Sequence, residues 1–227
     1  MLFYDCRLTF HDSLFYETRT LGRLYETGRL LHNIALCYAL GFAQTTYHHA
    51  NDVPRYAQEL AWLNENGVYV TPARGLEVGY VIHTFKLGEE RSAVLMERSN
   101  VNIPTYGRAK EIAIGSTFAF GILSEQPLIL PQWIRMGLWM SKARLKIEQT
   151  VELHYEQTVR SDTVRRYPLN PGDLPPGATA HIYDLVSMRP SNLLENVLID
   201  ADAWWVGRDK EQKPVRLPAG LAHRAAQ

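Results

Sequence analysis

The stretch from Trp133 to Tyr155 constrains the fold most, because its hydrophobic alternation changes phase part-way along. Before Ser141 the apolar residues stand at even positions: Ile134, Met136, Leu138 and Met140. After Ser141 they stand mostly at odd positions: Ala143, Leu145, Ile147, Val151 and Leu153. Side chains alternate strictly along a strand, so such a flip requires an extra residue or a reversal of the chain. The pattern predicts strand structure with a bulge or tight turn near Ser141.

The first of these segments also predicts an unusual surface. The side opposite Ile134 carries Trp133, Arg135, Gly137 and Trp139. Aromatic rings beside guanidinium and ammonium groups on an open sheet face suit unpaired nucleic-acid bases. Binding of single-stranded nucleic acid is therefore the first functional hypothesis.

Composition bounds this hypothesis. The 227 residues are 46% hydrophobic, enough for one large domain with its own core. The 24 basic and 24 acidic residues cancel, so a nucleic-acid role must rest on local patches or on a complex. Cys6 and Cys37 lie in apolar segments and are predicted to be buried free thiols, which suits a reducing cytoplasm. Leu30–Ala43 is too short to span a bilayer, and Asp5 and Arg7 interrupt the apolar start. We therefore expect a soluble, cytoplasmic protein without membrane contacts.

Periodicity predicts one early helix and many strands. The helix spans Leu30–Phe42 and ends near Gly41, and one short helix is expected around Tyr56–Leu63. Strands are expected at 2–10, 67–71, 78–86, 112–122, 133–155, 180–188 and near 197–206, with loops at 16–29 and 97–110. Residues 1–207 are predicted to form a single domain, and 208–227 a flexible tail. The fold class is α+β, an antiparallel sheet with a packed helix, compatible with a ferredoxin-like core or a half-open barrel.

One strand face is predicted to be shallow. Within 112–122, one side carries Ala113, Gly115, Ala119 and Gly121, opposite a row of isoleucines and phenylalanines. Small side chains leave a strand face that another group can approach closely.

Metal and cofactor motifs are missing from the sequence. It contains no Cys-x-x-Cys, no His-Glu-x-x-His and no glycine-rich phosphate loop, so neither a metal nor a nucleotide cofactor is expected. His48, His49 and Asp52 are the only grouping that suggests an ion site, and adjacent loop histidines are usually solvated.

Catalysis stays an alternative. A metal-independent ribonuclease needs a base for the ribose 2′-hydroxyl and a cation for the phosphorane. Such a site can be assembled on paper from His11, Tyr16, Tyr25, His32 and Lys142. His32 opens an apolar helix, where a capping role is the simpler interpretation, so a non-catalytic protein is favoured. A small-molecule-binding half-barrel is a third alternative.

Four segments share a mixture of basic and aromatic side chains. The candidate RNA-binding residues are Arg19, Arg23, Tyr25, Arg74, Tyr106, Arg108, Lys110, Arg135, Trp139, Lys142 and Arg144. Cations would hold phosphates and rings would stack bases. The alternative for each is ordinary surface charge or, for Trp133 and Trp139, a small core beneath a loop.

Several runs resemble one known family. They are LTFHDSLFYETRTLGRLYETGRLLHNIALCYALG (8–41), GVYVTPAR (67–74), NIPTYGRAKEIAIGSTFAFGIL (102–123) and WIRMGLWMSKARLKI (133–147). Together they resemble the subtype I-D CRISPR-associated RAMP protein, the Cas-five-type subunit of the I-D interference (Cascade) complex. The resemblance covers roughly 8–150 and more faintly YDLVSM at 183–188.

The resemblance implies a fold and a role. The fold would be a ferredoxin-like (RRM-type) domain with a protruding β-hairpin, and it is open whether 156–180 forms that thumb. The protein would be a non-catalytic subunit that caps the 5′ handle of the CRISPR guide RNA in antiviral defence. It would contact the large subunit and the first backbone subunit, and an auxiliary contact with target DNA near the flanking motif is plausible. A relative in another subtype cuts precursor RNA, so endoribonuclease activity on repeat RNA is the alternative.

The resemblance also assigns residues. It implies RNA contacts for Arg19, Arg23 and Tyr25, for Tyr106, Arg108 and Lys110, and for Trp139, Lys142 and Arg144. One departure is visible, because Leu138 stands where the family pattern leads us to expect a lysine before the tryptophan. A phosphate contact from that position is therefore not expected here.

Overall fold

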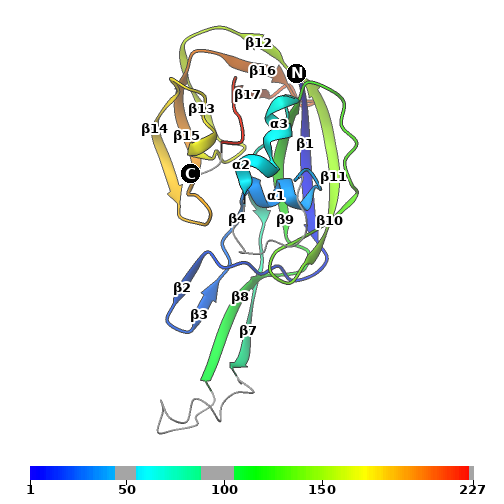
Figure 1. Cartoon of the computed structure of the whole chain (residues 1–227), viewed down its shortest axis with the longest axis vertical. Coiled ribbons are helices and arrows are strands. Elements are labelled where there is room, and N and C mark those ends of the chain that lie inside the picture. The colour runs from blue at the N-terminus through cyan, green and yellow to red at the C-terminus, as the bar shows by residue number, and fades with distance from the viewer. Residues whose placement is uncertain (44–54, 88–104, 225–227) are drawn as a thin grey trace.

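The computed structural model describes residues 1–43, 55–87 and 105–224. Its body is built on a seven-stranded sheet in the order β10-β11-β1-β9-β6-β4, with β5 also paired to β9. These strands are Leu2–Phe10 (β1), Leu30–Leu31 (β4), Tyr69–Val70 (β5), Ala73–Glu77 (β6), Thr117–Ser124 (β9), Trp133–Met136 (β10) and Ser141–Glu152 (β11). All their pairings are antiparallel, so the predicted antiparallel sheet is confirmed (Figure 1).

Three short helices cover one face of this sheet and enclose the main core. They are Asn33–Ala39 (α1), Tyr56–Glu59 (α2) and Ala61–Glu65 (α3). His32 caps α1 by accepting a hydrogen bond from the Ile34 amide, and Gly41 follows the helix with a φ of 78°. The predicted end of the helix is confirmed. Its predicted start is wrong, because Leu30–Leu31 pairs with β6 as a strand.

The C-terminal part of the chain packs on the other face, where β1 presents Phe3. It forms two three-stranded sheets, β12-β16-β17 and β13-β15-β14. Their elements are His154–Glu156 (β12), Arg160–Val164 (β13), the 3-10 helix Pro171–Asp173 (η1), Thr179–Val186 (β14), Leu193–Ala201 (β15), Trp204–Arg208 (β16) and Pro214–Pro218 (β17). Phe3 and Trp204 are fully buried in this second core. The single strand expected near 197–206 is therefore two strands, β15 and β16.

The expectation of a flexible tail from 208 is wrong for the described residues. β17 pairs with β16 along its whole length, and Leu217 is fully buried. Farther on, the buried His223 accepts a hydrogen bond from the Val70 amide. The tail looked polar because only alternate residues of β17 point inward.

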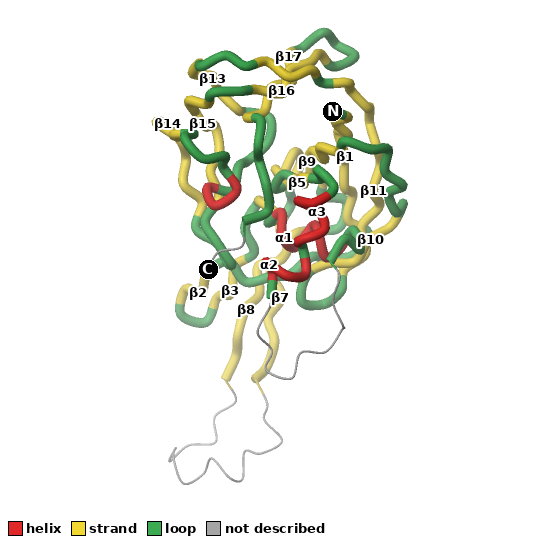
Figure 2. Tube along the Cα trace, turned by 45° about the horizontal axis from the view of Figure 1, so that its top comes forward, coloured by secondary structure: helices red, strands yellow, loops and turns green. Residues whose placement is uncertain are grey.

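A separate four-stranded sheet extends away from the body (Figures 1 and 2). It has the order β2-β3-β8-β7 and consists of Arg19–Leu21 (β2), Leu24–Glu26 (β3), Tyr80–Leu87 (β7) and Thr105–Ile112 (β8). The β7–β8 hairpin is the part that protrudes, whereas 156–180 lies in the body. The loops expected at 16–29 and 97–110 are wrong where these strands run.

The shallow strand face exists only in part. The expected strand 112–122 is divided, because β8 ends at Ile112 and β9 begins at Thr117, which leaves Ile114 exposed in the turn. Gly121 is approached closely, but by the protein itself: a Cβ at this position would lie 2.4 Å from the Phe3 ring. Ala119 stays partly accessible on the outer face.

The phase change in the 133–155 region is a hairpin turn, as predicted. β10 ends at Met136 and β11 begins at Ser141, and the two strands pair from Met136–Ser141 to Trp133–Arg144. Ile134 is buried whereas Trp133 is exposed, so the predicted sides of the first segment are confirmed. Leu138 and Met140, which were assigned to the core side, are instead exposed turn residues.

The connection between β9 and β11 bears on the fold class. A ferredoxin-like fold has two strand–helix–strand crossovers, and here the chain between β9 and β11, residues 125–140, holds β10 and no helix.

Cys6 and Cys37 are free and buried, as predicted, and burial raises the pKa of each thiol. Among the described residues, no helix has both the length and the apolar character needed to cross a bilayer.

Candidate nucleic-acid interface

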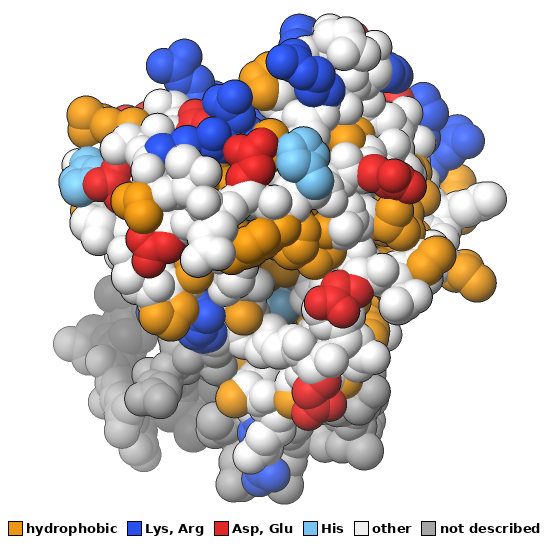
Figure 3. Space-filling view, turned by 90° about the horizontal axis from the view of Figure 1, so that it is seen from above, with side chains coloured by type: hydrophobic (Ala, Val, Ile, Leu, Met, Phe, Trp, Pro, Cys, Tyr) orange, Lys and Arg blue, Asp and Glu red, His pale blue; other side chains and the backbone are white. Residues whose placement is uncertain are grey.

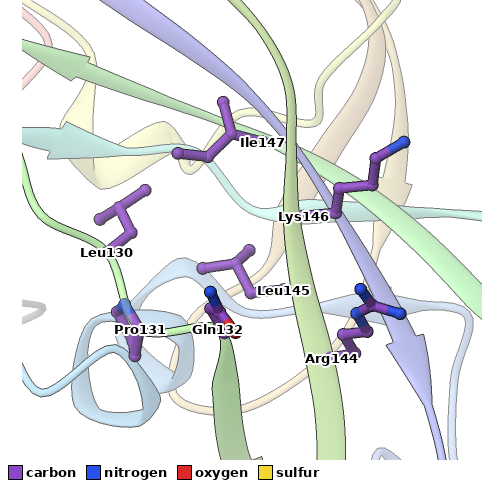
Figure 4. A pocket seen from close by; sticks show the side chains of 7 residues that line it. All are labelled: Leu130, Pro131, Gln132, Arg144, Leu145, Lys146 and Ile147. Atoms are coloured by element: carbon purple, nitrogen blue, oxygen red, sulfur yellow. The ribbon is translucent and has the colours of Figure 1, made fainter.

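The outer face of the main sheet carries cations above small side chains. Residues directly opposite each other in antiparallel strands share a face. One such row runs Trp133, Arg144, Thr9 and Thr117, and the next runs Lys146, Arg7, Ala119 and Arg74. Arg144 and Lys146 extend from the same side of β11, away from Leu145 (Figure 4). The result is an open face with cations on β11 and β1 and small side chains on β9.

Trp133 is held at the edge of this face by two neighbours. The Lys142 ammonium lies 4.2 Å from the centre of the Trp133 ring, and the His11 ring packs edge-on at 5.0 Å. His11 and Lys142 are themselves fixed by backbone hydrogen bonds, since the His11 amide donates to the Lys142 carbonyl at 2.9 Å. The indole is therefore preoriented while remaining 42% exposed.

Trp139 occupies the hairpin turn and stacks on Phe15, with ring centres 4.7 Å apart. The Leu138 amide donates to the Phe15 carbonyl at 2.9 Å, and the Arg135 guanidinium donates to the Met140 carbonyl at 3.0 Å. One face of the indole is covered by Phe15 and the side chain is 55% exposed. An exposed ring on a fixed support can stack a base.

The cations on this hairpin differ in whether they already form ion pairs within the protein. Within the described residues, Lys142 and Arg144 make no ion pair, whereas Lys146 bonds Glu148 at 3.0 Å. Elsewhere, charges of both signs are interspersed, as on the end of the molecule around β16 and β17 (Figure 3). The unpaired cations of β11 are thus the ones available to phosphates.

The protruding sheet brings together a second set of predicted residues. Register places Arg108 opposite Thr84 and Leu24, and Lys110 opposite Ile82 and Glu26. Arg19, opposite Glu26, shares this face. Lys110 lies 4.3 Å from the centre of the Tyr80 ring and 3.4 Å from a Glu26 carboxylate oxygen.

Glu26 limits what this second set can offer. Arg19 also pairs with Glu26, and the hydrogen bond from Arg19 holds the pKa of that carboxyl below its usual range. One carboxylate therefore occupies two of the predicted cations. Arg108 is exposed and unpaired among the described residues.

Two of the other predicted residues, Tyr25 and Arg23, do not join this face. Tyr25 pairs in register with Ala109, so it points to the opposite side of the sheet, where its ring lies 6.0 Å from that of Phe85. Arg23 lies in the β2–β3 turn, where its carbonyl accepts a hydrogen bond from the Arg108 amide. The backbone of Tyr106 belongs to β8, but its side chain lies outside the described residues.

Arg74 stands apart from both sets as part of an internal ion cluster. Its Nε lies 3.4 Å from a carboxylate oxygen of Glu195, and its Nη1 donates to the Arg165 carbonyl at 2.6 Å. Arg29 holds the other Glu195 oxygen at 2.6 Å, and Glu195 is almost fully buried. The position predicted to bind RNA instead joins β6 to β15.

The two sets are physically connected by residues 11–18. Leu14 forms a bridge with Ile112 at the base of β8, and the next residue, Phe15, supports Trp139. Phe15 is not among the predicted residues, because nothing in the local sequence pattern marks it as the support of a ring more than a hundred residues away. The hairpin turn thus lies beside the root of the protruding sheet.

The residues of the nuclease alternative have structural contacts. His32 is buried, bonds Ser191 through Nε2 at 3.0 Å and caps α1, and burial lowers its pKa to about 4. The Tyr16 hydroxyl donates to the carbonyls of Gly28 and Leu30, and burial raises its pKa. The interpretation of His32 as a cap is confirmed. His48, His49 and Asp52 lie outside the described residues, within which no group of three possible metal ligands is found.

A buried polar network lies apart from these surfaces. Asn33 and Tyr69 donate to the Asp173 carboxylate at 2.6 and 3.1 Å, and Cys37 lies 3.6 Å from His223 Nε2. Burial raises the pKa of Asp173 to about 6 and lowers that of His223 to about 4. Because Val70 already donates to the same His223 nitrogen, this group joins α1, β5 and the C-terminal segment rather than activating the thiol.

The family model described as Type I-D CRISPR-associated protein Cas5/Csc1 matches residues 1–226. The chain belongs to this family. No curated protein matches the sequence. Among solved structures, a chain of the Type III-B Cmr-beta complex bound to cognate target RNA and AMPPnP is similar, with a TM-score of 0.50 and 7% identity over 86% of each chain. At that identity the likeness concerns the fold alone. The Cas5/Csc1 assignment confirms the resemblance inferred from the sequence motifs.

Proposed function

We propose that this Cas5/Csc1 family member is an RNA-binding subunit of a type I-D CRISPR effector complex. It holds the 5′ handle of the guide RNA and docks to the large and backbone subunits. One observation carries the proposal: the β10–β11 hairpin presents two supported, exposed indoles beside unpaired Lys142 and Arg144. Rings stack bases and cations hold phosphates, which is the chemistry of single-strand recognition.

The balanced charge of the chain supports a role inside a complex. A protein with 24 basic and 24 acidic residues has little long-range attraction for RNA. Several of its predicted cations are neutralised by Glu26 and Glu195. The subunit therefore gains much of its RNA affinity from neighbouring proteins.

We also propose that the body is a ferredoxin-like core of the RAMP type. β1, α1 and β6 form a first crossover in which β9 lies between two parallel strands. β9 and β11 flank β1 in the same way, with β10 in the place of a second helix. The protruding β7–β8 hairpin is the elaboration on this core.

We propose that the subunit does not cleave RNA. A general base must be able to reach the 2′-hydroxyl, and the buried roles of His32 and Tyr16 support this proposal. Incubation of the isolated protein with repeat RNA and a chelator tests it. A discrete product that is lost in Tyr25→Phe or His32→Gln would establish the endoribonuclease instead.

Affinity purification of the tagged protein from its native host tests the main proposal. Sequencing should find co-purified guides of uniform length with one shared 5′ repeat remnant, together with a large and a backbone subunit. Precursor fragments without partner proteins would favour the nuclease. Absence of any RNA would exclude both functions.

The hairpin itself is tested by charge removal. Lys142→Ala combined with Arg144→Ala should weaken RNA binding and lower the slope of log affinity against log salt by about 0.7 per lost phosphate contact. The matched control, Arg208→Ala with Arg216→Ala, removes the same charge from the β16–β17 sheet. An unchanged slope in the first variant, or an equal change in both, would contradict a phosphate role for β11.

A further inference from the structure

The turn of the β10–β11 hairpin carries three consecutive apolar side chains that face solvent. Leu138 is 67% exposed, Trp139 55% and Met140 48%. Trp139 rests on Phe15, but Leu138 and Met140 belong to no hydrophobic cluster of the described residues. Adjoining large apolar side chains in water usually mark a binding surface.

This turn has a fixed shape. Gly137 and Met140 adopt positive φ angles of 80° and 53°, which set the reversal of the chain. The Met140 amide donates to the Gly137 carbonyl at 3.2 Å, and Arg135 and Phe15 bind the turn from outside. The apolar side chains are therefore presented in advance, and binding them costs little ordering entropy.

Charge around the turn selects the kind of partner. Arg135 precedes it, and Lys142 and Arg144 follow it on the strand. The nearby acid Asp12 accepts the Lys142 amide at 2.9 Å and keeps its negative charge, so the three cations outnumber it. An apolar tip between cations complements a stack of bases between two phosphate chains. Proteins that kink duplexes insert Leu, Ile, Met or Phe between base steps in this way.

We propose that Leu138 and Met140 form a wedge that enters a base step of double-stranded nucleic acid, with the flanking cations on its phosphates. This inference goes beyond recognition of a single-stranded handle and does not depend on it. It also gives a role to Leu138, the position where the resemblance suggested a lysine. With a leucine at this position, the protein lacks a phosphate contact but has a side chain that can insert between bases.

The test uses the full chain and a DNA duplex carrying 2-aminopurine beside a TA step, which unstacks easily. Binding should raise the 2-aminopurine fluorescence. Leu138→Ser combined with Met140→Ser should abolish the rise and weaken duplex binding about tenfold, while guide-RNA binding changes less than twofold. Ile129→Ser, which alters a fully exposed isoleucine outside the turn, should leave both signals unchanged.

The wedge would be overturned if the native chain caused no rise in fluorescence, or if the rise persisted in the double variant. It would also be overturned if the double variant lost a protein partner while it still opened the duplex. The last result would make the turn a protein contact. Retained RNA binding in the double variant shows that it is folded, and thermal unfolding checks this where RNA binding is absent. Absence of guide RNA from the complex purified from the native host, with duplex opening by the native chain intact, would refute the proposed handle function and leave the wedge standing.

Discussion

At the scale of single residues, the neighbours of an arginine decide whether it can bind a ligand. Arg74 and Arg144 are both predicted RNA-binding residues, and the structure places each in a strand of the main sheet. Arg74 reaches the buried Glu195, whereas Arg144 finds no carboxylate among the described residues. An arginine therefore links two strands at one position and is the proposed phosphate ligand at the other.

Arg74→Ala should lower stability rather than RNA affinity. Glu195 would keep only Arg29, so its buried carboxylate loses half of its charge compensation. The variant also loses the hydrogen bond from the Arg74 guanidinium to the Arg165 carbonyl. Hydrogen bonds to charged groups are worth about 1.5–3 kcal/mol, and because the Arg74 side chain is 34% exposed, solvent screening lowers the expected loss in the free energy of unfolding to about 1 kcal/mol. Urea unfolding and filter binding measure both quantities, with Arg144→Ala as control. If the variant kept its full stability but its RNA affinity depended less on salt, Arg74 would belong to the RNA-binding site.

Trp139→Ala should show the opposite behaviour. The indole is exposed on one side and stacks on Phe15 on the other. Base stacking is worth about 1–3 kcal/mol per ring, so RNA affinity should fall at least fivefold. The melting temperature should change by only a few degrees. A large stability loss with intact affinity would place Trp139 in a core.

At the scale of elements, strands form where distant partners supply hydrogen bonds. β3 is three residues long and carries little pattern of its own, yet it pairs in parallel with β8, whose residues lie more than eighty positions later. β17 likewise forms because it pairs with β16 and buries Val215 and Leu217 in the second core. Short elements of this kind escape a local periodicity search.

Removal of the last element tests this dependence. A chain ending at Arg208 lacks β17, its buried Val215 and Leu217, and His223. Burial of an aliphatic side chain contributes about 1.5–3 kcal/mol, so the loss approaches the whole stability of an ordinary domain. The truncated chain should lose cooperative unfolding in calorimetry. A chain ending at Arg224 is the control. Equal stability of the two chains would support the prediction of a flexible tail.

At the scale of the whole molecule, buried histidines couple stability to pH. The pKa values of His32 and His223 are lowered to about 4 by burial. Between that value and the ordinary 6.5 the unfolded chain binds more protons than the folded one, so stability falls as pH decreases. Asp173, with its pKa raised to about 6, acts in the opposite direction.

Acidification from pH 7 to 5 should therefore lower the free energy of unfolding. Each histidine contributes about 2 kcal/mol of loss and Asp173 offsets about 1 kcal/mol. Urea unfolding at both pH values measures the difference. His223→Gln keeps an acceptor for the Val70 amide and should remove one histidine's share of the pH dependence. An undiminished dependence would show that His223 does not carry it.

The sequence located features that depend on local pattern. Alternation over 2–10 identified β1, in which the alternate residues Tyr4, Cys6, Leu8 and Phe10 are buried. The phase change at Ser141 located the hairpin turn. Gly41 marked the end of α1 because a left-handed residue is needed there. Motif resemblance identified the family, which the family model confirms over nearly the whole chain.

Only the tertiary structure decided which of the predicted side chains share a surface. Tyr25 and Lys110 belong to strands that pair, yet they point to opposite sides of one sheet, and Arg74 is held by a glutamate from β15. Phe15 became important because the fold places it beneath Trp139. Periodicity follows from the backbone of each strand, so the sequence contains it. Face, register and ion partners follow from contacts between residues far apart in the chain, which only the assembled fold defines.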